Sequence, residues 1–334
     1  MRAAAYREQG PSSVLRIVER PIPTATPGDV VVRLHRAGVN PTDWKFRSGA
    51  LAMSFPEVIP GQDGAGVVHE VGDGVSGLRV GQPVWVHLCQ HDRPGGTAAE
   101  YTVQPAHHVV ALPEPDFDLG ASLGVPALTA HRMLTCGEVD RLAPGALDGV
   151  TVLVAGGAGA VGNAAIQLAR WAGATVITTI SSEEKAVLAT AAGAHHALNY
   201  RESGIADRIR ALAPEGVDHI VEVAPHDNLT LDIEVARNHA TIGFYANNGG
   251  PEATINLRDA FSKNLRLQGA ILYALLPAQL AAAVDDVSAA VAAGALGVGE
   301  ERGLPLHHFL LDRAGEAHDA VERGTIGKVL LDLE

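Results

Sequence analysis

The chain has 334 residues, 19% of them charged, and a formal net charge of −13, which argues against a nucleic-acid or anionic-membrane surface. No apolar run is long enough to cross a membrane, the N-terminus lacks a signal-peptide pattern, and two cysteines form no disulfide framework. We therefore expect a cytoplasmic protein of about two domains, with no nucleic-acid or membrane partner.

The first part of the chain, residues 1–126, carries short β-type runs that are interrupted by glycine and proline. These runs lie at 30–34, 66–71, 83–88 and 100–103. Many short strands separated by turn residues are typical of a compact β-rich domain. The tail, residues 299–334, returns to short β-type runs, and we expect it to join this domain.

Between residues 127 and 298, strand candidates alternate with alanine-rich helical segments. The strand candidates lie at 151–155, 176–180, 219–223 and 241–244, and 280–296 is interpreted as a helix. This alternation predicts an α/β domain with a doubly wound parallel sheet.

The segment 151–162, TVLVAGGAGAVG, joins an apolar strand to a glycine loop and the start of a helix. Gly157, Gly159 and Gly162 fill the G-x-G-x-x-G pattern, and a β-branched run at 174–180 completes a βαβ unit. We predict a dinucleotide site with a phosphate at the helix N-terminus. The predicted loop contacts are Gly157, Ala158, Gly159, Ala160, Val161 and Gly162.

The end of the second strand indicates which nucleotide binds. An acidic residue about 20 positions past the loop normally holds the ribose 2′-hydroxyl of NAD, and this chain lacks it. Ser181, Ser182 and Lys185 stand there instead, and they are suited to a 2′-phosphate, which predicts NADPH. A second interpretation stays open, in which Ser182 only caps a helix starting near Glu183 and Lys185 is solvated.

Six motifs, in this order, resemble those of a known family: AGVNPTDWKFRSG at 37–49, PGQDGAGVVHEVGDGV at 60–75, GGTAAEYTV at 95–103, PALTAH at 126–131, GGAGAVG at 156–162 and GKVLL at 327–331. The chain resembles the medium-chain dehydrogenase/reductase superfamily, zinc-independent quinone oxidoreductase (zeta-crystallin-like) branch. The resemblance implies a GroES-like catalytic domain at 1–126 joined by the tail 299–334, and a Rossmann NADPH-binding domain at 127–298. It also implies a homodimer formed through an edge strand at 264–272.

The resemblance places the site residues as well. Asn40 is implied to lie beside the nicotinamide ribose and the acceptor, where its amide donates to the oxygen that gains charge. An alternative is that Asn40 is a turn residue before Pro41, with Asp43 capping a short helix. The implied substrate pocket comprises Trp44, Leu51, Gln62, His91 and Tyr273. The further implied cofactor contacts are Thr129, Tyr200, Ala224, Phe244, Tyr245 and Thr325.

The departures from the zinc-dependent relatives concern the metal ligands. Asn40 and Gln62 stand where those relatives place a cysteine and a histidine, and amides are poor zinc ligands. A residual metal candidate is the set His87, Cys89, His91 and Asp92, whose odd-numbered members would share one face of a strand. The alternative is surface or cleft histidines with a lone thiol, and we expect no metal.

These features predict a zinc-independent, NADPH-dependent oxidoreductase that transfers a hydride to a quinone or an α,β-unsaturated carbonyl compound. Relatives carry a substrate-contacting tyrosine near positions 50–51, which are apolar here, so the proton donor is open between water, Tyr273 and His91. Two alternatives remain: an enoyl-thioester or polyketide-pathway enoyl reductase, and an NADPH-binding crystallin-like protein with incidental activity.

Overall fold

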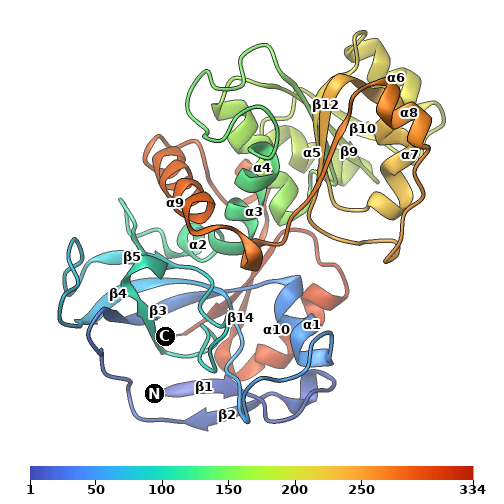
Figure 1. The fold of residues 1–334 in the computed structure, drawn as a ribbon. Helices are drawn as coiled ribbons and strands as arrows, with labels where there is room; N and C mark the ends of the chain where they lie inside the picture. The colour runs from blue at the N-terminus through green and yellow to red at the C-terminus, as the bar shows by residue number, and fades with distance from the viewer. Residues whose placement is uncertain (334) are drawn as a thin grey trace. The chain divides into compact units, whose positions relative to one another are not determined.

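The computed structural model describes residues 1–333, which form two compact units (Figure 1). Unit 1 comprises residues 1–125 together with the C-terminal segment from residue 305, and unit 2 comprises residues 126–304. Within the described chain, every helix is too short or too polar to span a lipid bilayer.

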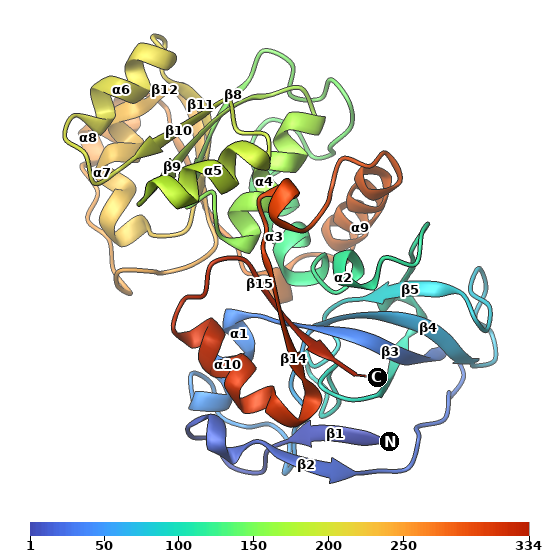
Figure 2. The same ribbon diagram turned by 180° about the vertical axis from the view of Figure 1, so that it is seen from behind.

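Unit 1 is built on a mostly antiparallel sheet that the C-terminal segment completes. Its strand order is β14-β15-β3-β4-β5-β7, and β6 also pairs with β3. β15 pairs antiparallel with β3, and Figure 2 shows both C-terminal strands beside it. The strands are β3 (Asp29–Val39), β4 (Asp63–Val71), β5 (Pro83–Val86), β6 (Tyr101–Pro105), β7 (Val109–Ala111), β14 (Leu306–Leu310) and β15 (Lys328–Asp332), besides the separate pair β1 (Arg2–Ala5) and β2 (Arg16–Glu19).

The helices of unit 1 are short, and the sequence sets their ends. α1 (Pro41–Ser48) begins with Pro41 at its first position and with a capping box between Asn40 and Asp43, and Gly49 ends it at φ 110°. α1 packs against α10. The remaining helical segments are α2 (Phe117–Gly120), α10 (Ala314–Glu322), and the 3-10 turns η1 (Ser12–Val14), η2 (Ala106–His108) and η5 (Leu311–Arg313).

Unit 2 contains a six-stranded parallel sheet in the order β10-β9-β8-β11-β12-β13, which is the 3-2-1-4-5-6 order of a doubly wound fold. The strands are β8 (Thr151–Ala155), β9 (Thr175–Ile180), β10 (His196–Asn199), β11 (Val217–Glu222), β12 (Ala236–Phe244) and β13 (Arg266–Gly269). Val152, Val154 and Val176 are fully buried, as expected for strands covered on both faces.

The helices of unit 2 form two groups. α4 packs on β8 and β9 and contacts α9, whereas α6 and α8 both contact α7 (Figures 1 and 2). The predicted α/β fold, with a GroES-like unit and a doubly wound unit, is therefore confirmed. The helical segments are α3 (Gly124–Leu134), α4 (Ala160–Trp171), α5 (Glu183–Ala191), α6 (Ile205–Leu212), α7 (Pro225–Val235), α8 (Leu257–Ser262), α9 (Pro277–Ala292), η3 (Leu272–Ala274) and η4 (Glu300–Arg302).

Candidate active site

The glycine loop of unit 2 connects β8 to α4. A Cβ atom on Gly157 would overlap the Thr178 hydroxyl, and one on Gly162 would overlap the carbonyl oxygen of Gly156. Gly159 differs, because the nearest atom to its added Cβ would be 3.4 Å away. Gly157 and Gly162 are thus required by packing between loop, strand and helix, and Gly159 leaves free space at the loop surface.

The start of α4 provides the donors for an anion. Gly159 is the N-cap residue, and its carbonyl accepts the first intrahelical hydrogen bond from the Asn163 amide at 2.8 Å. The backbone N–H groups of the first turn, at Ala160, Val161 and Gly162, precede that bond and have no partner within the helix. Together with the helix dipole, they make this loop suitable for a phosphate.

The end of β9 carries the residues proposed for the 2′-phosphate. The Ser182 hydroxyl caps α5 by accepting from the Lys185 amide at 3.4 Å, as the capping interpretation predicts. Lys185 is not simply solvated, because it is half-buried and its Nζ donates to the Ser181 hydroxyl at 3.0 Å. Tyr200 follows β10, donates its amide to the Ile180 carbonyl at 3.0 Å and has a half-exposed side chain.

Other predicted cofactor contacts lie along the same carboxyl edge of the sheet. Ala224 follows β11, Phe244 ends β12, and Tyr245 donates its amide to the Glu222 carbonyl at 3.2 Å. Thr129 is buried within α3. The structure therefore gathers the glycine loop, the Ser181 region and these strand ends at one edge, whereas Asn40 and Thr325 belong to unit 1.

A buried acid pair at this edge was missed by the sequence analysis. Glu222 ends β11 and accepts from the Asn228 amide at 3.1 Å and from the Ala224 backbone N–H. Burial raises the pKa of Glu222, and burial together with the Glu222 charge raises the pKa of Asp232 on α7 well above its usual range. Two buried carboxyl groups that lie together disfavour a double negative charge. An acid at the end of the apolar run Ile220–Val221 was the available sequence signal.

Unit 1 places Asn40 in a buried network of charged groups. Its Nδ2 donates to Asp63 Oδ2 at 2.6 Å, and Lys328 Nζ donates to its Oδ1 at 2.7 Å. Lys328 Nζ also lies 3.5 Å from Asp63 Oδ2. The Asn40 backbone amide donates to Asp43 Oδ2 at 2.7 Å, so Asn40 also begins α1, as the turn interpretation predicts.

Burial dominates the electrostatics of this network. It raises the pKa of Asp63 and lowers that of Lys328, while the opposite charges partly counteract both shifts. Burial also raises the pKa of Asp43 to about 7. Lys328 and Asp63 are functional candidates that the sequence did not reveal. They stand in the motifs at 327–331 and 60–75, where nothing marks either side chain as a site residue.

The predicted substrate-pocket residues differ in burial and in the unit to which they belong. Gln62 is buried, and its amide exchanges hydrogen bonds of 3.2 Å with Gln90. Trp44 is half-buried on α1, whereas Leu51 has an exposed fraction of 64%. His91, in the turn after β5, also belongs to unit 1, and Tyr273 lies in η3 of unit 2.

Residues 87–92 do not form the strand on which His87, Cys89 and His91 would share one face. β5 ends at Val86, and the chain turns through Leu88 and Asp92, whose φ angles are 52° and 53°. Nowhere in residues 1–333 do three His, Cys, Asp or Glu side chains converge in an arrangement that suits a metal ion. The amides of Asn40 and Gln62 are taken by protein partners, so this donor set does not fit zinc.

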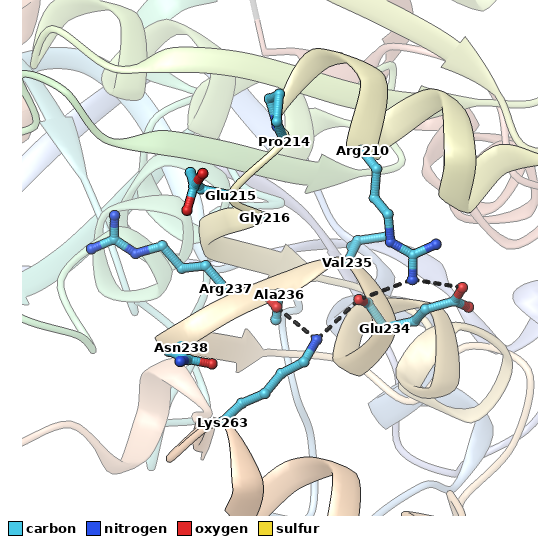
Figure 3. A pocket seen from close by; sticks show the side chains of 10 residues that line it. All are labelled: Arg210, Pro214, Glu215, Gly216, Glu234, Val235, Ala236, Arg237, Asn238 and Lys263. Carbon is cyan, nitrogen blue, oxygen red and sulfur yellow. Dashed lines mark hydrogen bonds and ion pairs between the residues drawn. The ribbon is translucent and has the colours of Figure 1, made fainter.

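A surface pocket of about 500 Å³ lies at the opposite, amino-terminal edge of the unit 2 sheet, where β11 and β12 begin (Figure 3). Lys263 Nζ donates to the carbonyls of Ile233, Glu234 and Ala236 at 2.7 to 3.0 Å. Arg210 pairs with Glu234 at 2.8 Å. These two cations support the end of α7, and we assign no ligand to this pocket.

Two protein families match this chain, one within each unit. Residues 26–114 match the alcohol dehydrogenase GroES-like domain family, and residues 160–289 match the zinc-binding dehydrogenase family. A quinone oxidoreductase of Homo sapiens is 31% identical over 337 residues, which cover 99% of this chain and 97% of the human protein. A 2-haloacrylate reductase of Burkholderia sp. is 31% identical over 260 residues, covering 75% of this chain and 74% of that protein.

Solved structures show the same fold. An NAD-dependent alcohol dehydrogenase superimposes with a TM-score of 0.87 at 28% identity, covering 100% of both chains. A mycobacterial protein in complex with NADPH has a TM-score of 0.82 at 27% identity, covering 99% of both chains. With its two units, its glycine loop and its full-length similarity to these proteins, the chain belongs to the medium-chain dehydrogenase/reductase superfamily and is an oxidoreductase of the quinone oxidoreductase branch.

Proposed function

We propose that this protein is a zinc-independent, NADPH-dependent reductase of quinones or α,β-unsaturated carbonyl compounds. The observation that carries the proposal is Lys185, which reaches back to Ser181 at the end of β9, where an NAD-binding protein normally places an acid. The glycine loop, with Gly159 open at its surface, lies at the end of the adjacent strand β8. These residues fit a dinucleotide that carries a 2′-phosphate.

The cofactor would be held by unit 2 through the residues of its carboxyl edge. The first turn of α4 would bind the pyrophosphate, and Ser181, Ser182 and Lys185, with Tyr200 nearby, would bind the 2′-phosphate. When bound, the nicotinamide supplies a hydride. The mycobacterial structure in complex with NADPH supports this choice, whereas the NAD-dependent neighbour shows that the shared fold alone does not determine the nucleotide.

The role of unit 1 is to stabilise charge on the acceptor. Asn40 Nδ2 carries two N–H groups, and Asp63 accepts one of them. The second would donate to the acceptor oxygen that gains charge on reduction. The residues proposed to surround the acceptor are Trp44, Leu51, Gln62, His91 and Tyr273, and those proposed at the nicotinamide end are Thr129, Ala224, Phe244, Tyr245 and Thr325.

Two relatives support quinones and activated alkenes as the substrate classes. The human relative is a quinone oxidoreductase, and the Burkholderia relative reduces 2-haloacrylate, an alkene conjugated to a carboxyl group. Zinc independence rests on the donor set, since the two amides that replace metal ligands are already hydrogen-bonded to Asp63, Lys328 and Gln90.

We further propose that the enzyme is a cytoplasmic homodimer that pairs through β13. β13 is an edge strand, and the exposed fractions of Leu267, Ile271 and Leu276 on and after it are 36%, 58% and 65%. An exposed apolar edge favours pairing with a second copy. Sedimentation should give a dimer that Ile271→Asp shifts toward monomer, and a monomeric parent protein would contradict the proposal.

The test of the function is NADPH oxidation by purified, chelator-treated protein with quinones, enones, enals and enoyl-thioesters, with NADH measured alongside. We expect saturable turnover that survives chelation and prefers NADPH. Turnover only with enoyl-thioesters would identify the alternative enoyl reductase. Tight NADPH binding without turnover on any acceptor would favour the crystallin-like alternative, and loss of activity on chelation would refute zinc independence.

A further inference from the structure

We propose that Lys328 and Asp63 are positioning residues that hold the Asn40 amide in one orientation, with its second N–H directed to the acceptor. The inference rests on the proposed function for the role of Asn40, but the orientation itself can be tested without turnover. The three residues come from the start of α1, β4 and β15, and each has an exposed fraction of 2% or less.

The orientation follows from the chemistry of the two partners. A lysine ammonium has only donors, and an ionised carboxylate has only acceptors. With Oδ1 2.7 Å from Lys328 Nζ and Nδ2 2.6 Å from Asp63 Oδ2, the amide matches both. A flipped amide would place an N–H group against the ammonium and an oxygen against the carboxylate. Both contacts would be repulsive, so the pair allows one orientation.

The same arrangement leaves one donor over. Nδ2 carries two N–H groups and Asp63 accepts one of them, so the second is the donor that we assign to the acceptor. Buried amide hydrogens are normally paired, so an unused one is a candidate for a ligand contact. Because the amide already donates to a carboxylate and accepts from an ammonium, its remaining donor is fixed before an acceptor arrives. A preorganised donor of this kind stabilises developing negative charge.

The surrounding backbone makes room for both charged side chains and fixes them. Asp63 Oδ1 accepts from the Val125 amide at 2.8 Å. A Cβ on Gly124 would overlap that same oxygen, and a Cβ on Gly38 would lie 2.9 Å from Lys328 Cε and Nζ. Gly124 therefore provides the space that Asp63 needs, whereas Gly38 is required first by the Ala121 carbonyl oxygen, which an added Cβ would overlap. The pair is a built feature of unit 1 and not a chance contact.

The experiment compares Asp63→Asn with the double variant Asp63→Asn/Lys328→Met. In Asp63→Asn, Lys328 still donates to Asn40 Oδ1 and the new amide oxygen can accept from Nδ2, so the orientation is kept. The double variant removes the Lys328 ammonium, and no Asp63 carboxylate is left unpaired. An asparagine side chain at position 63 can form a hydrogen bond with the Asn40 amide in either of its two orientations. Asp63→Asn leaves the Lys328 ammonium buried without its carboxylate, and the double variant carries neither charge, so the unfolding free energy of both proteins is measured and kcat is compared only between folded proteins.

We expect kcat of the double variant to be about tenfold to a hundredfold below that of Asp63→Asn, comparable to weakening one transition-state donor. KM for NADPH should be unchanged in both, because the proposed phosphate contacts lie in unit 2. Equal kcat values in the two folded variants, or a loss confined to KM, would overturn the proposal, because a purely structural lysine predicts them.

A second readout separates this inference from the proposed function. The side-chain amide signals of Asn40, identified by their disappearance in Asn40→Asp, should be sharp and slow to exchange in the parent and in Asp63→Asn. They should broaden or double in the double variant. If no acceptor supports turnover, the function fails while these signals still decide the orientation. Identical Asn40 signals in the three proteins would refute the positioning role.

Discussion

The proposed sites of the two units differ in how far their polar groups are buried. At the carboxyl edge of unit 2, Ala160 and Val161 in the first turn of α4 are partly exposed, and Lys185 is half-buried. Unit 1 buries charged and polar side chains among one another. Most of the buried side chains that have partnerless polar atoms in the described chain belong to unit 1: Asp43, Arg47, His87, Gln104, His108 and His318, against Arg132 and Asp232 in unit 2.

This difference indicates how each unit should respond to substitution. Buried polar groups without partners cost stability, and buried charges are tolerated only while their partners remain. Changes in the unit 1 network should therefore alter folding and chemistry together. Changes at the surface of the unit 2 edge should alter nucleotide affinity while the fold is kept.

The largest effect is expected from removing one partner of the buried ion pair. Asp63→Ala leaves Lys328 charged, buried and without its carboxylate, which should lower the free energy of unfolding by about 3–5 kcal/mol. Urea unfolding measures the loss. Asp207→Ala is the matched control, because Asp207 forms an ion pair with Arg210 at 3.5 Å while 88% exposed. It should change stability by less than about 1 kcal/mol. Equal losses in the two variants would contradict the network.

The next largest effect is acid destabilisation of unit 1. Burial lowers the pKa of His87 to about 3, of His108 to about 4 and of His318 to about 3, whereas unfolded histidine titrates near 6.5. The unfolded chain therefore binds more protons below pH 6.5. Stability is fully present above that pH and falls toward pH 4, by about 1.4 kcal/mol per pH unit for each extra proton.

The variant His87→Leu removes one of the three histidines and therefore one of the extra protons that the unfolded chain binds. The raised pKa of Asp43 acts in the opposite direction, since its contribution is lost as the pH rises toward 7, so the informative quantity is a difference between proteins. Between pH 6 and 4.5, the unfolding free energy of His87→Leu should fall less steeply than that of the parent, by about one proton. The same substitution at the exposed His69 is the control. Parallel curves for parent and His87→Leu would refute a neutral buried His87.

A smaller effect separates packing from binding within the glycine loop. Gly162→Ala should lower the stability of unit 2 by about 1–3 kcal/mol, because its methyl group overlaps the Gly156 carbonyl oxygen. Gly159→Ala meets its nearest atom only at 3.4 Å and should fold nearly as the parent does. It should nevertheless weaken NADPH binding, because the methyl group occupies the surface proposed for the pyrophosphate. Unfolding curves and NADPH titrations distinguish the two, and unchanged NADPH affinity in Gly159→Ala would move the phosphate elsewhere.

The two sites also differ in how far the sequence could predict them. The glycine loop, its strands and its helix occupy about 30 consecutive residues, so local patterns predicted the βαβ unit. The unit 1 network joins positions 40, 63 and 328, which meet only because β3 pairs with both β4 and β15. Lys328 starts an apolar strand, and nothing local marks a lysine there as buried.

Two further misses have local physical causes. The segment 87–92 contains no glycine or proline, so no local pattern predicts the positive φ angles at Leu88 and Asp92, where the chain turns after the strand. Glu222 and Asp232 lie ten residues apart on β11 and α7, and they come together only when the helix packs on the sheet. The cap at Ser182, which the sequence offers as an alternative to phosphate binding, depends only on neighbours in the chain and is formed.

The most selective effect concerns Lys185 and leaves the fold untouched. Lys185→Ala removes the cation proposed for the 2′-phosphate, so it should weaken NADPH binding by about 1–3 kcal/mol and NADH binding very little. Asp116→Ala is the matched control, because it removes the side-chain cap of α2 in unit 1, at a cost of about 1 kcal/mol of stability, and leaves the proposed phosphate contacts intact. Titration of both nucleotides into both variants gives the four affinities. Equal losses of NADPH and NADH affinity in Lys185→Ala would mean that the lysine supports the end of β9 through Ser181 and does not recognise the phosphate.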